Sequence, residues 1–213
     1  MKYNTKKLTT ISMLAAISYV VMLFGRIPMV LFLKYDPKDV IITIGGFIYG
    51  PMVSAIISVC VSFVEMFTAS DTGIYGLIMN IISTCSFACV ASMIYKKKRT
   101  ISGALVGLIF ATIFMSLIML LWNYYITPLY LNQPRESVIP ILLPTILPFN
   151  LIKGSLNAAF TLMLYKPVVN GLRKAKLIPQ VTVSNKKVMS FGIFSCSAFV
   201  VICLIMLVKI IWP

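Results

Sequence analysis

Long apolar runs with few charged residues follow one another along this chain, and they constrain its fold more than any other feature. Hydrophobic residues make up 60% of the sequence and charged residues 11%, whereas soluble domains carry about 25% charged residues. A helix of roughly 20 apolar residues can cross a bilayer with all its backbone hydrogen bonds satisfied internally. The sequence therefore predicts an all-α, polytopic integral membrane protein.

Hydropathy predicts six membrane segments and one further apolar run. The second segment is too short to span alone, so we expect it to pack inside the protein or to borrow from the preceding loop. The six segments are Leu8–Phe24, Val40–Gly50, Pro51–Phe67, Leu77–Tyr95, Ile101–Tyr125 and Ile141–Tyr165, and the further run is Val188–Trp212. We expect a six-helix substrate-binding transmembrane domain over residues 1–178, then a linker and an extra C-terminal apolar helix over residues 179–213.

Lysines and arginines are distributed unequally between the predicted loops. With a cytoplasmic N-terminus, thirteen of them lie on the cytoplasmic side and five on the other. Cytoplasmic loops of membrane proteins are enriched in these residues, so the bias predicts a multi-pass protein of the cell membrane with its N-terminus in the cytoplasm. Topology also accounts for the net charge of +14, and we expect no nucleic-acid partner.

Several kinds of chemistry are disfavoured by what the sequence lacks. Histidine, the commonest general base and metal ligand, is absent. The five cysteines lie within apolar runs and are interpreted as small core residues. No glycine-rich phosphate-binding motif occurs, so ATP hydrolysis by this chain alone is not expected. We predict no metal site, no cofactor and no enzymatic activity.

One lysine, Lys153, lies in a stretch otherwise apolar enough to cross a bilayer, Leu147–Tyr165. A charge at membrane depth is costly and usually functional. Asn150 and Asn157 are spaced to share a helix face with it. Lys153 precedes Lys166 by 13 residues, about 20 Å of helix, which places it in the outer half of the bilayer. This face could hold a polar small molecule; alternatively, Lys153 reaches the interface or pairs with an acid.

Other features point to the same outer side. Asn123 ends the fifth segment at a similar height. The loop GRIPMVLFLKYDPKD, residues 25–39, is apolar in its middle and is predicted to fold back as a lid, with an interfacial hairpin as the alternative. Pro148 suits the first turn of a helix, whose free backbone N–H groups would point into the cavity beside Asn150 and Lys153.

A pair of small residues, Ser12 and Ala16, lies in the first segment. Spaced four apart, they form a small-xxx-small pattern that lets another transmembrane helix approach closely. The pattern alone leaves open whether that helix is internal or belongs to another subunit, and it favours the internal one.

Six motifs, in order along the chain, resemble those of one family. They are LFLKYDPKD, IGGFIYGP, SDTG, WNYYITPLY, LPFNLIKG and MLYKP, and the resemblance runs over about residues 8–176. The family is the riboflavin-specific substrate-binding subunits (S components) of energy-coupling-factor (ECF) transporters. The resemblance implies six transmembrane helices with both ends cytoplasmic, and riboflavin as the transported ligand in an outward cavity capped by the first outer loop. It also implies a transmembrane coupling subunit and two ATPase subunits as partners.

The resemblance also implies roles for individual residues. The family's riboflavin contacts fall on Asn123, Asn150 and Lys153, and a contact from the first outer loop falls near Leu33. Asn157 joins these candidates through its helical spacing. The family's docking pattern on the first helix falls on Ser12 and Ala16. The run Val188–Trp212 departs from the family, because a seventh helix would place the C-terminus outside.

We therefore expect the substrate-capture subunit of an ECF-type vitamin importer, which delivers riboflavin through an ATP-driven coupling module. One alternative is an S component for another vitamin, such as thiamine or a pterin. Another is a self-contained secondary carrier, although no internal inverted repeat is evident. A structural membrane anchor would leave the polar face around Lys153 unexplained.

Overall fold

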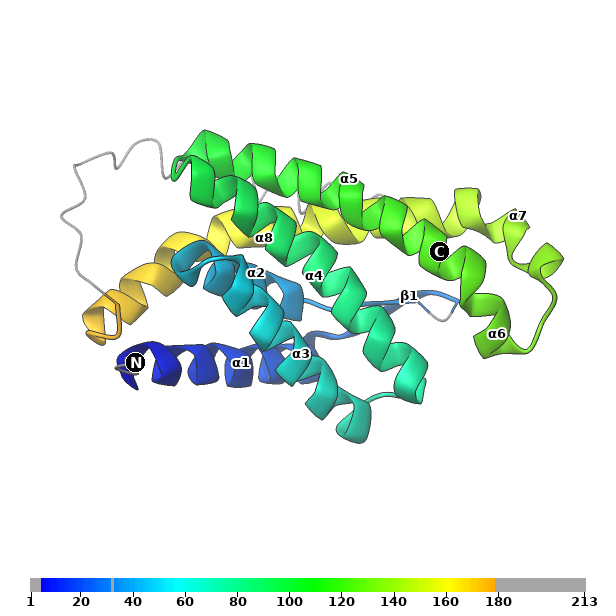
Figure 1. Cartoon of the computed structure of the whole chain (residues 1–213), viewed down its shortest axis with the longest axis horizontal. Coiled ribbons are helices and arrows are strands. Elements are labelled where there is room, and N and C mark those ends of the chain that lie inside the picture. The colour runs from blue at the N-terminus through cyan, green and yellow to red at the C-terminus, as the bar shows by residue number, and fades with distance from the viewer. Residues whose placement is uncertain (1–4, 32, 179–213) are drawn as a thin grey trace.

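The computed structural model describes residues 5–31 and 33–178, so the predicted C-terminal helix Val188–Trp212 lies outside the described residues. The described part is an elongated bundle of helices with one short hairpin (Figure 1). In chain order its elements are α1 (Thr5–Gly25), β1 (Ile27–Val30), β2 (Leu33–Tyr35), α2 (Lys38–Tyr49), α3 (Pro51–Thr68), α4 (Gly73–Lys97), α5 (Ile101–Tyr125), α6 (Thr127–Leu131), η1 (Arg135–Ser137), α7 (Ile139–Ile141), η2 (Leu142–Ile146) and α8 (Leu147–Lys174).

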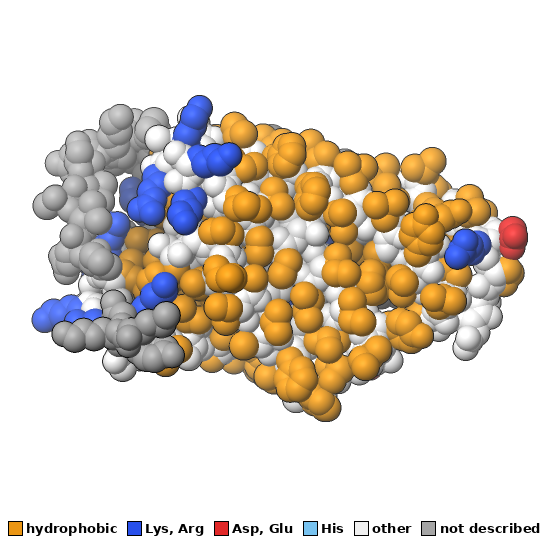
Figure 2. Space-filling view, in the orientation of Figure 1, with side chains coloured by type: hydrophobic (Ala, Val, Ile, Leu, Met, Phe, Trp, Pro, Cys, Tyr) orange, Lys and Arg blue, Asp and Glu red, His pale blue; other side chains and the backbone are white. Residues whose placement is uncertain are grey.

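Five helical segments of the described part are long and apolar enough to cross a membrane. They are α1, α3, α4, α5 and the run Arg135–Lys174 that ends in α8. Apolar side chains cover the side of the bundle shown in Figure 2, as expected for a surface in contact with lipid. The predicted helical membrane fold is confirmed, and α5 has the bounds that the sequence predicts.

Helix α2 is short and enclosed by its neighbours. Ten of its twelve residues are buried, and it contacts α1, α3, α4 and α8. It begins at Lys38 and not at Val40 as predicted, because Lys38 and Asp39 are buried in its first turn with partners from other helices. At its end Gly50, with φ of 102°, makes the turn to Pro51 and α3.

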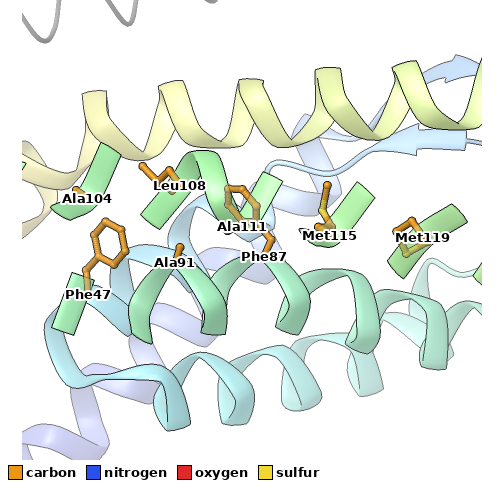
Figure 3. Packing of buried hydrophobic residues seen from close by; sticks show 8 residues of the cluster. All are labelled: Phe47, Phe87, Ala91, Ala104, Leu108, Ala111, Met115 and Met119. Atoms are coloured by element: carbon orange, nitrogen blue, oxygen red, sulfur yellow. The ribbon is translucent and has the colours of Figure 1, made fainter. Parts of the chain in front are cut away.

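The largest apolar core joins α2, α4 and α5 (Figure 3). Its buried members are Phe47, Phe87, Ala91, Ala104, Leu108, Ala111, Met115 and Met119. Phe47 stacks on Tyr95 with ring centroids 4.3 Å apart, and the Tyr95 and Tyr165 hydroxyls lie 3.1 Å apart. This core fixes α2 against α4 and α8, and thereby sets the position of the first residues of α2.

The predicted outer loop forms an antiparallel hairpin, β1–β2. Leu33 and Tyr35 on β2 are buried. Leu33 packs with Ile146 and Phe149, whereas Tyr35 packs in a separate cluster with residues of α8. The loop therefore folds back onto the bundle, as predicted.

Helix α8 begins differently from the prediction. The five residues before it form a π-helical turn, η2, and Ile146 at the junction is itself helical. The backbone N–H of Leu147 therefore donates to the carbonyl of Leu142. Pro148 lies in the first turn of α8 as predicted, but the expected free start of the helix is wrong, because the chain enters α8 already helical. The helix also runs past Tyr165 to Lys174, with Pro167 inside it.

The two ends of the bundle differ in charge. One end, here called the basic end, holds the start of α1, the α4–α5 junction and the end of α8; most visible lysines and arginines gather there, on the left of Figure 2. Its basic residues are Lys6, Lys7, Lys96, Lys97, Lys98, Arg99, Lys166, Arg173, Lys174 and Lys176. The other end carries the hairpin and is called the hairpin end.

Candidate functional site

A cavity of about 80 Å³ lies at the hairpin end, beneath the β1–β2 hairpin. Residues that are far apart in sequence, from Arg26 after α1 to Lys153 on α8, converge on it, and most of them are polar. The lining residues are Arg26, Leu33, Lys34, Asp36, Glu65, Ser70, Asp71, Thr72, Met79, Asn80, Ser83, Met119, Phe149, Asn150 and Lys153. Polar groups gathered in a concave site of an apolar bundle are the usual mark of ligand binding.

A network of buried charges ties the hairpin to the helices on one side of the cavity. Arg26 donates to Asp36, with Nε 2.7 Å from Oδ1, and also to Glu65. Lys38 pairs with Glu65 and lies 3.6 Å from Asp36. Asn80 donates to the Glu65 carboxylate at 2.9 Å. Each carboxylate thus has more than one donor, which a buried charge requires.

The network controls the ionisation of its members outside the spanning helices. Burial alone would raise the pKa of Asp36, but Lys38 and the hydrogen bond from Arg26 outweigh it and hold that pKa below its ordinary value. Burial alone would lower the pKa of Arg26, but Asp36 and Glu65 raise it above its ordinary value. Both groups therefore stay charged at neutral pH.

A second ionic group surrounds Lys153. Its ammonium lies 3.5 Å from Oδ2 of Asp39 and 3.4 Å from the hydroxyl of Ser83. Asp39 also accepts hydrogen bonds from Thr84, at 2.7 Å, and from the amide of Asn157, at 3.2 Å. The sequence offered no identifiable partner for Lys153; the structure supplies Asp39 from α2.

The predicted site residues fall into two sets. Leu33, Asn150 and Lys153 line the cavity together, on β2 and α8. Asn123 and Asn157 are not among the lining residues, although both are fully buried. Asn157 faces Asp39 behind Lys153, which its position one turn farther along α8 explains.

Asn123 belongs to the junction between α5 and α6. Its amide donates to the carbonyl of Met119 at 2.7 Å, and its Oδ1 accepts from the Thr127 hydroxyl at 2.8 Å. Met119, one turn earlier on α5, does line the cavity. Asn123 is therefore next to the site, with its side chain engaged in the helix junction.

Sequence reasoning assigned no site role to most polar residues at or behind the cavity, among them Asp39, Glu65, Asn80 and Ser83. Asn80 and Ser83 are three apart on α4, so they share a face of an otherwise apolar helix. That spacing was a usable signal. Asp39 has no such signal in the sequence, because the residues that donate hydrogen bonds to it lie 45 and 118 residues away along the chain.

Two other predictions concern residues away from the cavity. Ser12 and Ala16 on α1 are both exposed, so their small side chains leave a shallow surface open to an outside helix. Among the described residues, no group of three or more histidine, cysteine or acidic side chains could hold a metal ion.

The chemistry of the cavity suits an uncharged ligand with both apolar and polar parts. Met79, Met119 and Phe149 supply apolar walls. Asn150 offers an amide that both donates and accepts, and Lys153 offers only donors. The side-chain amide nitrogen of Asn150 donates to the carbonyl of Ile146 at 2.8 Å, which leaves the amide oxygen of Asn150 as an acceptor for a ligand.

Comparison with known proteins gives consistent matches. The family model described as "ECF transporter, substrate-specific component" matches residues 6–165. The chain is 32% identical to the riboflavin transporter RibU of Staphylococcus aureus (strain TCH60), over 80% of this chain and 94% of that protein. It is 31% identical to the riboflavin transporter FmnP of Bacillus subtilis (strain 168), over 76% and 92%. A solved S component of a bacterial ECF transporter superposes with a TM-score of 0.68 at 32% identity, covering 79% of this chain and 98% of that one.

Proposed function

The chain belongs to the family of substrate-specific components of ECF transporters, and on this premise we propose that its cavity captures riboflavin. Members of this family are transporters and not enzymes. The coarse function, a substrate-binding membrane subunit, follows from membership. Riboflavin as the ligand of this chain is the finer proposal, and it is supported by relatives that are named riboflavin transporters.

The observation that carries the proposal is the pairing of Asn150 and Lys153 with apolar walls in one cavity. Riboflavin has a flat apolar ring, a polar pyrimidine edge and a hydroxylated chain. Met79, Met119 and Phe149 suit the ring, while Asn150 and Lys153 suit the oxygens and the imide of the edge. Analogues without those polar groups would leave buried donors unpaired, so the site discriminates against them.

The hairpin is the element that we propose admits the ligand. The cavity of about 80 Å³ is smaller than the roughly 300–1,000 Å³ that pockets for ligands of this size occupy. Leu33 on β2 lines the cavity and packs on Ile146 and Phe149. Binding therefore requires β1–β2 to move outward, and the return of Leu33 would close the site over the ring. We further propose that Asn123 turns to the ligand in that state.

The membrane context is also part of the proposal. The concentration of lysines and arginines at the basic end supports a cytoplasmic N-terminus in the cell membrane, with the hairpin end outside. In that orientation the cavity takes riboflavin from the exterior. A transmembrane coupling subunit would dock on α1 at Ser12 and Ala16, and two ATPase subunits would drive release to the cytoplasm.

The decisive experiment is the absorption spectrum of the detergent-purified protein, followed by titration of riboflavin with its fluorescence as the readout. We expect a yellow protein or one that quenches riboflavin fluorescence on binding. Asn150→Ala and Lys153→Ala should each weaken affinity by about tenfold or more. Asn150→Ala should not lower the yield of folded protein, whereas Lys153→Ala also leaves the buried Asp39 without its ion pair. Binding of thiamine or a pterin in place of riboflavin, or transport by the chain alone in liposomes, would contradict the proposal.

A further inference from the structure

Asp39 is a fully buried carboxylate in the first turn of α2. Its Oδ1 accepts a hydrogen bond from Thr84 at 2.7 Å. Its Oδ2 accepts from Asn157 at 3.2 Å and faces the Lys153 ammonium at 3.5 Å. Donors from α4 and α8 thus hold the carboxylate, and the amino end of α2 adds a favourable dipole. Asp39 cannot swing away without losing all these contacts.

Asp39 lies behind the cavity wall and not on it. Lys153 lines the cavity, whereas Asp39 is not among the lining residues. The carboxylate therefore contacts Lys153 without itself lining the cavity. A ligand in the cavity would contact Lys153 and not Asp39.

The other cations of the site have their own carboxylates. Arg26 and Lys38 are paired with Asp36 and Glu65. Among the described residues Lys153 forms its ion pair with Asp39, and it also donates to the neutral hydroxyl of Ser83. An uncompensated ammonium in this buried place would be strongly unfavourable. Asp39 is thus the carboxylate in direct contact with Lys153, although the charge of Lys153 also acts on Asp36.

We propose that Asp39 is a positioning residue for ligand capture: from behind the wall it neutralises Lys153 and aims its ammonium into the cavity. Lys153 then acts as a hydrogen-bond donor without adding net charge to the site, which suits the uncharged ring of a flavin. This role rests on the proposed function, since it concerns the same ligand.

A double-mutant cycle of Asp39→Asn and Lys153→Met, made in the full chain, tests this role. Asparagine keeps the shape of Asp39 and an acceptor for Thr84, but it removes the charge and the acceptor that faces Lys153 and Asn157. The readouts are riboflavin affinity and the position of the visible absorption band of the bound flavin. We expect each single substitution to weaken affinity by about tenfold or more. With Lys153→Met already present, Asp39→Asn should change affinity by less than about twofold.

The absorption band separates positioning from simple structural support. Asp39→Asn should shift the band in the same direction as Lys153→Met, because both move or remove the same donor. Thr84→Val is the matched control: it removes the 2.7 Å hydrogen bond to Asp39 but keeps the ion pair. It should lower thermal stability and leave the band in place. If Asp39→Asn does not fold, Asp39→Glu keeps the charge, displaces the ammonium, and should give the same band shift.

Several results would overturn the inference. One is an equal loss of affinity from Asp39→Asn in the wild type and in Lys153→Met. Another is a band shift in Thr84→Val equal to that in Asp39→Asn. Coupling of Asp39 to Lys153 in thermal stability but not in affinity would reduce the pair to a structural contact. Wild-type protein that does not bind riboflavin at all would instead overturn the proposed function, which is a distinct result.

Discussion

Lys34 on β2 and Asp71 in the α3–α4 turn form a salt bridge of 2.7 Å at the exposed rim of the cavity. The hydrogen bond from Lys34, together with its charge, holds the pKa of Asp71 below its ordinary value. Arg26 adds a second link to the same turn, with Nη1 3.0 Å from the carbonyl of Ala69. The hairpin is thus tied to the α3–α4 turn where it would have to open.

Asp71→Asn is expected to speed both association and dissociation of riboflavin by a few fold, with a small change in affinity. The rim salt bridge is exposed, so it contributes little to stability but must break each time the hairpin opens. Stopped-flow fluorescence quenching at low ionic strength measures both rates. In the wild type, added salt should move the rates toward those of the variant, because salt screens exposed charges.

The charge-reversed pair Lys34→Asp with Asp71→Lys serves as the control for the rim salt bridge. It restores opposite charges at the same two positions and should return the rates toward wild type. Rates in Asp71→Asn that equal wild type at low salt would show that the rim salt bridge does not control opening.

Asn123 is expected to affect ligand binding in a way that its partner Thr127 does not. If Asn123 turns to the ligand, Asn123→Ala weakens riboflavin affinity by about tenfold. Thr127→Val removes the 2.8 Å hydrogen bond to the same side chain and frees its Oδ1, so affinity should stay the same or improve. Fluorescence titration of both variants makes the comparison. Equal losses of affinity and of melting temperature in the two would indicate a purely structural junction.

Acid is expected to weaken the network around Asp36. Because the pKa of this carboxyl is lower in the folded protein than its ordinary 3.8, its ionised form stabilises the fold above about pH 4. That contribution is lost as the pH falls through the lowered pKa. The ionisation of Asp36 should therefore leave the melting temperature in detergent nearly constant between about pH 7 and 5. Below about pH 4 the melting temperature should fall.

Asp36→Asn isolates the contribution of this carboxylate. It leaves Arg26 and Lys38 with Glu65 alone, so the melting temperature at pH 7 should fall by several degrees. The difference between wild type and variant should shrink as the pH drops below about 4. A difference that does not depend on pH would mean that charge at Asp36 is not what stabilises the hairpin.

Bulk added at Ser12 and Ala16 is expected to block assembly and not ligand capture. Ser12→Leu with Ala16→Leu fills the shallow surface of α1 far from the cavity, so riboflavin affinity should be unchanged. Co-purification with the coupling subunit and uptake in vesicles that contain the whole transporter should be lost. Cys60→Leu, at an exposed position of α3, is the matched control. Assembly that survives both substitutions on α1 would place the docking surface elsewhere.

Hydropathy predicted the fold well where a helix is bounded by clear local signals. Helix α5 has the predicted bounds because Thr100 caps its start by accepting from the backbone N–H of Gly103, and a charged run precedes it. The start of α2 was misplaced by two residues because hydropathy treats Lys38 as a loop residue. In the structure the carboxylate of Glu65, 27 residues away, pairs with Lys38 and so allows its burial. Local pattern carries no information about such a partner.

The site was predicted in the same uneven way. Lys153 and Asn150 were found because polar side chains inside an apolar stretch are conspicuous, and Leu33 came from the family resemblance. Asp39 was assigned to an outer loop, because its role depends on how α2 packs against α4 and α8 and not on its neighbours in sequence. The helical entrance to α8 was missed because Pro148 suggested a free helix start, while the π-helical turn η2, which contains Pro144, continues directly into α8.

The pairing of charges near the cavity has an electrical consequence. In the described part of the chain, Arg26, Lys38 and Lys153 are matched by Asp36, Asp39 and Glu65. A membrane potential acts on each elementary charge with about 2.3 kcal/mol per 100 mV, but these six sum to zero. If the subunit tilts or turns within the bilayer while carrying an uncharged vitamin, this cluster crosses the field with no net electrical work. The movement of this cluster would then add no voltage dependence to the reorientation of the subunit.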